Sequence, residues 1–156
     1  MPIASNLSAF AEAVPRDRGL LGLDVARTTI GVAGADPTWS VATPLATIRR
    51  TRFHRDVEEL ARLIRERDAG GLVIGWPVNM DGSEGPRCQS VRQFALNLEE
   101  RLPLPMLLWD ERWSTRAVER RMIEADLSRR KRAARVDAAA AAYILQGALD
   151  ALRRAG

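Results

Sequence analysis

The first third of the chain has the pattern of β-strands. Residues 19–24 form a short apolar run, and residues 29–35 alternate bulky and small side chains after a turn. Residues 40–48 form a third β-like segment, in which Pro44 favours an edge strand or a bulge. The pattern predicts three adjacent antiparallel strands.

After these strands the apolar period changes from two to 3.6. Asp56 can cap a helix, because Glu59 stands three residues on, at the matching position of a capping box. Helical spacing then continues until Gly70 and Gly71, which are typical of a helix end. The pattern therefore predicts a helix after the third strand.

Short apolar runs and amphipathic segments alternate in the rest of the chain. Residues 72–74 and 105–109 are typical of buried parallel strands, and an amphipathic helix through residues 91–98 separates them. Two more helices are predicted at about 114–126 and 136–153.

The resulting order, β-β-β-α-β-α-β-α-α, predicts an α/β fold with a mixed five-stranded sheet. Three antiparallel strands are extended by two parallel strands through βαβ crossovers, and helices flank the sheet. This is the element order of a ribonuclease H-like fold. We expect residues 19–153 to form a single domain of this kind and residues 1–18 to form a flexible N-terminal extension.

The scarcity of cysteine and histidine limits the kinds of catalytic and metal site that the chain can form. Among 156 residues the only cysteine is Cys88, which excludes an internal disulfide and a multi-cysteine zinc site and favours a reducing, cytoplasmic location. Because His54 is the only histidine, a Ser/His/Asp or Cys/His catalytic set would have to include it. It lies in an arginine-flanked run, 49–55, that has the pattern of a solvated connection. Because no apolar run approaches the ~20 residues of a membrane span, we expect no membrane partner.

Positive charge is concentrated in one stretch. The net charge is +4, but residues 112–135 alone carry nine basic and three acidic side chains. Such a stretch fits a phosphate-backbone partner, although a solvated helix face gives the same pattern. Arg116 and Arg120 have the spacing of one helix side, which favours the polyanion. The basic cluster that follows them is Arg129, Arg130, Lys131 and Arg132.

Acidic residues stand where predicted elements begin or end. Asp24 ends the first strand, Asp110 and Glu111 end the last strand, and Asp137 lies in the first turn of the final helix. Strand ends of an open α/β sheet converge on one crevice. Converging carboxylates favour Mg²⁺ or Mn²⁺, which can activate a water for phosphodiester hydrolysis. The alternative is that Asp137 only complements the helix dipole and that Asp24 only forms a turn.

Four blocks of residues occur in an order that is highly specific. They are Gly22-Leu23-Asp24 with Ile30-Gly31-Val32-Ala33, Gly75-Trp76-Pro77 with the loop 80–86, Asp110-Glu111-Arg112 with Ser114-Thr115, and Arg129 to Arg132 with Asp137 and the apolar residues that follow. With these blocks, residues 19–150 resemble the YqgF family of bacterial nucleases. That family is described as Holliday junction resolvases and as nucleases that mature the precursor of the small-subunit (16S) ribosomal RNA.

The resemblance implies that Asp24, Glu111 and Asp137 are catalytic acids that bind Mg²⁺ or Mn²⁺. Asp110 is a further candidate metal ligand. Because side chains alternate at a strand end, only one of this pair is expected to point inward; we choose Glu111 and keep Asp110 as the reserve. The expected partner is nucleic acid, either structured RNA or branched DNA, bound by a monomer or a homodimer. The residues expected to contact it are Arg87, Arg112, Ser114, Thr115, Arg116, Arg129, Arg130, Lys131 and Arg132.

The sequence departs from the family pattern just after Asp24, where Asp-x-Gly and a basic pair are usual. Ala26, Thr28 and Thr29 occupy those positions. Alanine in place of glycine adds a methyl group near the first acid, and threonines in place of basic residues remove potential phosphate contacts. A second hypothesis is therefore a catalytically silent, nucleic-acid-binding ribosome-assembly factor.

Overall fold

The computed structural model describes residues 3–4, 6–79, 81–113 and 129–155, with the backbone alone at 113, 129–137 and 155. The helix predicted at about 114–126 lies outside the described residues, and so do Ser114, Thr115 and Arg116.

The described strands form one mixed sheet in the order β1-β6-β5-β2-β3-β4. β2, β3 and β4 are antiparallel neighbours, whereas β5 pairs parallel to β2, β6 to β5, and β1 to β6. The strands are β1 (Ile3–Ala4), β2 (Gly19–Val25), β3 (Thr29–Ala35), β4 (Thr43–Arg49), β5 (Ala69–Trp76) and β6 (Met106–Asp110). The ribonuclease H-like arrangement is confirmed, but the sheet has six strands instead of the expected five because β1 joins its edge.

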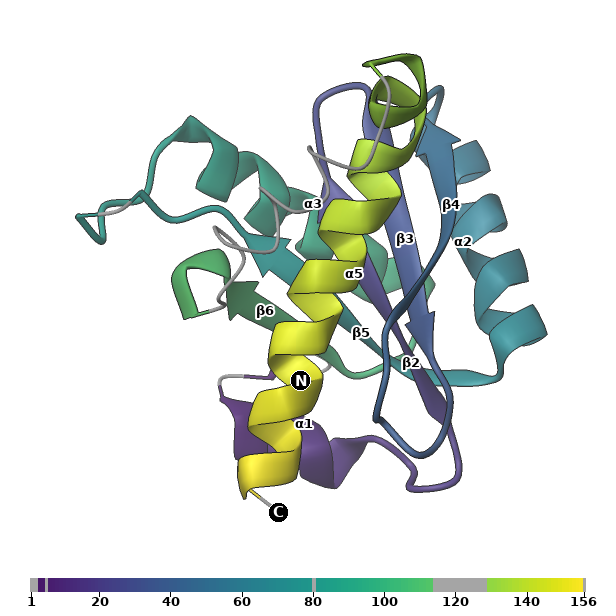
Figure 1. Cartoon of the computed structure of the whole chain (residues 1–156), viewed down its shortest axis with the longest axis vertical. Coiled ribbons are helices and arrows are strands. Elements are labelled where there is room, and N and C mark those ends of the chain that lie inside the picture. Colours follow the sequence, from purple (N-terminus) through teal and green to yellow (C-terminus); the bar gives the residue numbers. More distant parts are fainter. Residues whose placement is uncertain (1–2, 5, 80, 114–128, 156) are drawn as a thin grey trace.

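Helices cover both faces of this sheet (Figure 1). α5 (Arg129–Ala155) crosses one face, and α1 (Leu7–Ala13) packs with it. α2 (Phe53–Arg67) and α3 (Pro86–Arg101) cover the other face. Side chains along β2 alternate between the two cores, so that Leu20 packs on the α5 side and Leu21 on the α2 and α3 side.

β4 forms one edge of the sheet, as the proline in this segment predicts. Its pairing with β3 shifts register between Val32 and Ala33, where Ala33 pairs with Pro44. A proline cannot donate a hydrogen bond to the ladder, and an edge position with a local irregularity accommodates it.

α2 begins at Phe53, earlier than the predicted cap. Asp56 lies in the first turn, where its buried carboxylate accepts a hydrogen bond from the Thr51 N–H at 3.2 Å. The helix ends at Arg67, because Asp68 adopts a left-handed conformation with φ 50°. The prediction that Asp56 is the N-cap and that a glycine pair stops the helix is therefore wrong. Those glycines belong to β5.

α5 begins at Arg129 instead of about residue 136, so the backbone of the basic cluster 129–132 forms the start of this helix. Its buried positions include the small residues Ala141 and Ala148, which allow a close approach to the sheet. No helix in the described ranges is both long and apolar enough to cross a bilayer.

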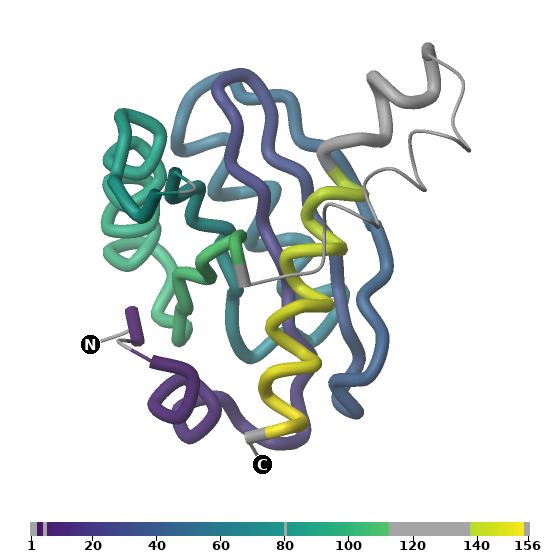
Figure 2. Tube along the Cα trace, turned by 60° about the vertical axis from the view of Figure 1, so that its left-hand side comes forward, coloured from purple at the N-terminus to yellow at the C-terminus, as the bar shows by residue number. Residues whose placement is uncertain are grey.

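The N-terminal residues differ from the expected extension. Ile3–Ala4 pairs in parallel with β6, and α1 buries Phe10 completely. A Cβ on Gly71 of β5 would lie 2.8 Å from Val14 Cγ2 and 3.0 Å from Phe10 Cζ, so the glycine lets this segment pack on the sheet. Figure 2 shows α1 near the C-terminal end of α5. A two-residue strand and a short Ala/Ser-rich helix carry too little pattern to be recognised from sequence.

We expect Asn6→Ala to lower the free energy of unfolding by about 1 kcal/mol, the usual value of a side-chain helix cap. The Asn6 side chain caps α1 by accepting a hydrogen bond from the Ala9 N–H at 2.8 Å. Urea unfolding measures the change, and Asn6→Asp, which retains an acceptor, is the control. Equal stability of all three proteins would show that α1 is not coupled to the rest of the fold.

Candidate active site

Asp24 lies near the C-terminal end of β2, on the side of the sheet that α5 covers. Two residues earlier, a Cβ on Gly22 would lie 2.6 Å from Leu145 Cβ and 3.0 Å from the Ala141 carbonyl oxygen, both on α5. Because side chains two apart on a strand share a face, Asp24 stands on this same side. It is half-buried, beyond the point of closest contact between α5 and the sheet.

Glu111 directly follows β6 and reaches the same side. It is buried, at 8% exposure, and begins the short 3₁₀ turn Glu111–Trp113. A Cβ on Gly75 of β5 would lie 3.2 Å from Glu111 Oε2 and 2.4 Å from Ile144 Cδ1 of α5. The Glu111 carboxylate therefore lies over Gly75, on the α5 side of the central strand.

The sheet register brings the two acids together. Leu23 pairs with Ile74, so the next residues along these parallel neighbours are Asp24 and Gly75. On the other side of β5, Gly75 pairs with Trp109 of β6, two residues before Glu111. Asp24 and Glu111 thus flank one glycine, from neighbouring strands on either side of β5.

Asp137 belongs to α5, one helical turn before Ala141. Because α5 runs opposite to β2 (Figure 1), its N-terminal part lies toward the strand end that carries Asp24. The side chain of Asp137 is outside the described residues, so its place in the site remains a prediction.

Asp110 has a different environment from Glu111. Trp109 belongs to the core on the α5 side, so alternation places Asp110 toward the opposite side of the sheet. Its carboxylate is 3% exposed and accepts hydrogen bonds from Arg112 Nη2 at 2.6 Å, from Arg112 Nε at 3.1 Å and from the Arg112 backbone N–H at 2.9 Å. These bonds raise the pKa of Arg112, chiefly through the side-chain hydrogen bond to Asp110.

The loop between β5 and α3 is ordered by short polar contacts. Asp81 accepts hydrogen bonds from the Ser83 hydroxyl at 2.6 Å and its backbone N–H at 2.9 Å, which lower the pKa of Asp81. Gly82 has φ +91°, a conformation that favours glycine. At the end of the loop, Arg87 Nη2 donates to the Val25 carbonyl at 3.4 Å, one residue beyond Asp24. Arg87 is thus held at the end of β2, on the α3 side, and its contact with nucleic acid stays a prediction.

A family model described as a Holliday junction resolvase, RuvX, matches residues 18–151. The chain belongs to the RuvX family. RuvX and YqgF are two names of one family, so the match confirms the resemblance that the sequence motifs indicate. The "Putative pre-16S rRNA nuclease" of Rhodobacter capsulatus is 55% identical over 154 residues, which cover 99% of this chain and 97% of that protein. The protein of the same name from Rhodospirillum rubrum is 59% identical over 155 residues, 99% of this chain and 96% of that one.

A solved structure shows the same fold. The structure titled "T. thermophilus RuvC in complex with Holliday junction substrate" has a TM-score of 0.52 to this chain at 11% identity. The match covers 89% of this RuvX-family chain and 96% of the other one. At this identity the similarity concerns the fold alone.

The carboxylate pair in this RuvX-family chain fits a hard divalent cation. Asp24 and Glu111 offer oxygen donors, the ligand type that Mg²⁺ and Mn²⁺ prefer. Because Gly75 has no Cβ, the Glu111 carboxylate can lie directly over β5, where a Cβ would come within 3.2 Å of Oε2. Among the described side chains, no group of three or more His, Cys, Asp or Glu residues could hold a metal ion. The third acid implied by the sequence, Asp137, is the one whose side chain lies outside them.

The substitution that distinguishes this chain from the family pattern is accommodated without backbone strain. In the described residues the non-glycine positions with positive φ are Trp39 and Asp68, so Ala26 adopts a conformation open to any residue. Its N–H donates to the Thr29 carbonyl at 2.9 Å, closing the β2–β3 turn.

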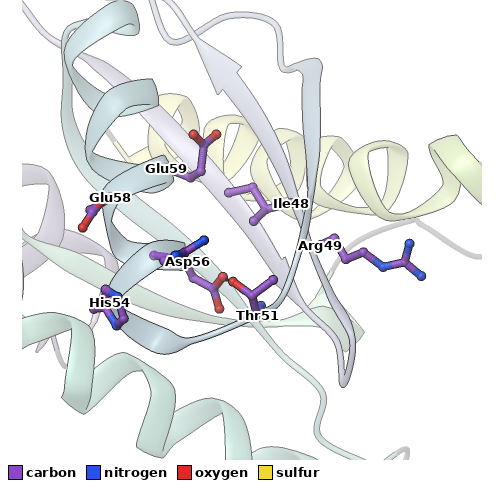
Figure 3. Close-up of a pocket in the computed structure, with 8 residues that line it drawn as sticks. Ile48, Arg49, Thr51, His54, Asp56, Glu58 and Glu59 are labelled. Atoms are coloured by element: carbon purple, nitrogen blue, oxygen red, sulfur yellow. Dashed lines mark hydrogen bonds between the residues drawn. The ribbon is translucent and has the colours of Figure 1, made fainter.

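A hollow lies between β4 and α2, apart from the two acids (Figure 3). Its volume is about 510 Å³, and its lining includes the exposed His54 and the buried Asp56 but neither Asp24 nor Glu111. Figure 3 shows Asp56 beside Thr51, whose backbone N–H donates a hydrogen bond to the Asp56 carboxylate. Asp56 thus has a structural contact at the start of α2, on the other side of the sheet from α5.

Gly75 and Gly22 are the site residues whose role the sequence alone does not show. A glycine near the end of an apolar strand signals a close approach of another element. Which element approaches depends on the packing of α5, which is distant in sequence.

Proposed function

We propose that this RuvX-family chain is a metal-dependent endonuclease that hydrolyses phosphodiester bonds of nucleic acid. The observation that carries the proposal is the convergence of Asp24 and Glu111 beside Gly75 at the C-terminal ends of parallel strands. Ligand sites of open α/β sheets form at such ends. The family description and the names of the relatives support a nuclease.

Asp24, Glu111 and Asp137 would hold Mg²⁺ or Mn²⁺. Such an ion, when bound, would supply a nucleophile from water at neutral pH and would stabilise the leaving oxygen. The carboxylates of the chain would position it at the C-terminal ends of β2 and β6, and basic residues would hold the nucleic-acid backbone. The candidates for this second role are Arg87, Arg112, Ser114, Thr115, Arg116 and the cluster 129–132.

The proposed substrate is the precursor of 16S ribosomal RNA, because two relatives above 50% identity carry that substrate in their names. Branched DNA is the second candidate, supported by the family description. Symmetric cleavage of a four-way junction needs two active sites, so a stable homodimer would favour branched DNA and a monomer would favour RNA.

A cleavage panel tests the function. It contains labelled ribosomal-precursor RNA, a four-way DNA junction and duplex DNA, each with Mg²⁺, with Mn²⁺ and with excess chelator. We expect cleavage of the RNA that stops with chelator and returns when the ion is restored. Asp24→Asn, purified identically, controls for contaminating nucleases.

Two outcomes would contradict the proposal. Cleavage that persists in chelator would refute metal dependence. Binding without cleavage under every metal condition would favour the silent assembly factor, and Ala26→Gly, Thr28→Lys and Thr29→Arg would then be the first reversions to test.

A further inference from the structure

A second hollow lies just beyond Asp24, on the side of the sheet that α3 covers. Its volume is about 420 Å³. Three segments distant in sequence form it, namely the end of β2 with the β2–β3 turn, the residue after β4 and the first turns of α3. The lining residues are Val25, Ala26, Arg27, Arg50, Pro86, Arg87, Ser90 and Val91.

Two of its three arginines are held by backbone carbonyls. Arg50 Nη1 donates to the Ala26 carbonyl at 2.8 Å, and its guanidinium carbon lies 5.2 Å from the centre of the Phe94 ring. Arg87 Nη2 donates to the Val25 carbonyl at 3.4 Å. A guanidinium has five N–H donors, so each can bind a further acceptor. Because Arg50 is already oriented, it loses less side-chain freedom when it does so.

The hollow is strongly positive. The lining named above contains three arginines and no acidic residue. Within the described part of the chain, none of the three forms an ion pair. The N-terminal end of α3 also faces this region, and the dipole of a helix makes that end positive. The chemistry therefore selects an anion that accepts several hydrogen bonds, such as a phosphate group.

The position of the hollow relates it to the acids. Val25, whose carbonyl holds Arg87, directly follows Asp24 in β2. The Cα atoms of Asp24 and Ala26 are at most about 7 Å apart, because each residue spans no more than about 3.6 Å. Asp24 stands on the α5 side of the strand end and the arginines on the α3 side, so a nucleic-acid strand that passes over this end can reach both.

We propose that Arg27, Arg50 and Arg87 bind one backbone phosphate of the cleaved strand, adjacent to the scissile phosphate. This inference rests on the proposed nuclease function and adds to it a positioning site. Guanidinium forks hold a non-reacting phosphate and thereby fix the register of the strand relative to Asp24 and Glu111.

Binding measurements in the Asp24→Asn background test the proposal separately from catalysis. The double variant Arg27→Gln/Arg87→Gln removes two exposed arginines and leaves Arg50, with its structural contacts, in place. We expect it to bind the panel RNA about tenfold or more weakly at 100 mM salt. The slope of log Kd against log salt should fall by about 0.7 to 0.9, the value for one lost phosphate contact. Arg65→Gln, an exposed arginine at the far end of α2, is the matched control and should be unchanged.

Neutral methylphosphonate linkages, placed one at a time around the cleavage site, locate the phosphate. At one adjacent linkage the neutral group should weaken binding by the protein with intact arginines but not by the double variant. A parallel substrate without its terminal phosphate tests the other source of the same chemistry. If only that removal weakens binding, the assignment to a backbone phosphate is wrong.

The failures of the two proposals are distinguishable. If the wild type cuts RNA and the salt slope of the double variant is unchanged, only the arginine site is refuted. A protein that neither binds nor cuts any panel substrate would refute both. Thermal unfolding of each variant within about 2 °C of the parent confirms that the fold is intact.

Discussion

Glu111→Gln should lower the rate of phosphodiester cleavage at least a hundredfold, whereas Asp110→Asn should lower it by no more than about tenfold. Both substitutions keep side-chain size and remove one charge. Glu111 Oε2 lies over Gly75 on the α5 side, at the strand ends that carry Asp24, where the proposed cation would bind. Loss of a direct ligand costs more than the 10- to 100-fold typical of groups that act through a ligand.

Asp110→Asn should affect stability more than activity. The Asp110 carboxylate is buried and bonded to Arg112 through side-chain and backbone donors. An amide there accepts weaker hydrogen bonds and removes the negative charge that pairs with Arg112 at 2.6 Å. We expect a loss of about 1–3 kcal/mol in the free energy of unfolding.

Single-turnover cleavage and urea unfolding, both run on the two variants, separate these roles. Asp24→Asn provides the reference for loss of a direct ligand. If Asp110→Asn loses as much activity as Glu111→Gln while its stability is unchanged, Asp110 is a ligand and the assignment from strand alternation is wrong.

The order of elements and the positions of the acids follow from the sequence. Alternating residues predict the β2–β3 hairpin and the β4 edge, and apolar runs predict β5 and β6. Alternation alone states that one of Asp110 and Glu111 points inward. Which one it is depends on Trp109, which packs toward α5, and that packing is a tertiary fact.

The missed features have physical reasons. β1 and α1 contain too few residues to show a strand or helix period in hydrophobicity, although Phe10 of α1 is fully buried. The arginine-lined hollow joins Arg50 to Ala26, 24 residues apart, and Arg87 to Val25, 62 residues apart. No local pattern reports such contacts. Arg27 directly precedes Thr28 and Thr29, the positions where the family pattern has a basic pair. The sequence alone does not predict a role for the Arg27 charge.

Gly75→Ala should reduce both stability and cleavage. The added Cβ would lie 2.4 Å from Ile144 Cδ1, so α5 or its side chain must shift, at a cost of about 1–3 kcal/mol. It would also lie 3.2 Å from Glu111 Oε2 and push on the carboxylate itself. A displacement of about 1 Å at a catalytic group can cost a hundredfold in rate, so we expect cleavage to fall more than tenfold.

Two further variants separate these effects. Ile144→Val removes Cδ1, so Gly75→Ala/Ile144→Val should recover part of the stability that Gly75→Ala loses, measured by urea unfolding as a double-mutant cycle. Cleavage should remain low in the double variant, because the contact with Glu111 persists. Gly34→Ala is the matched control: its Cβ would lie 2.8 Å from Leu45 Cδ1, a similar clash away from the acids. If Gly34→Ala lowers cleavage as much as Gly75→Ala does, general destabilisation explains the loss, and Glu111 does not depend on the space that Gly75 leaves.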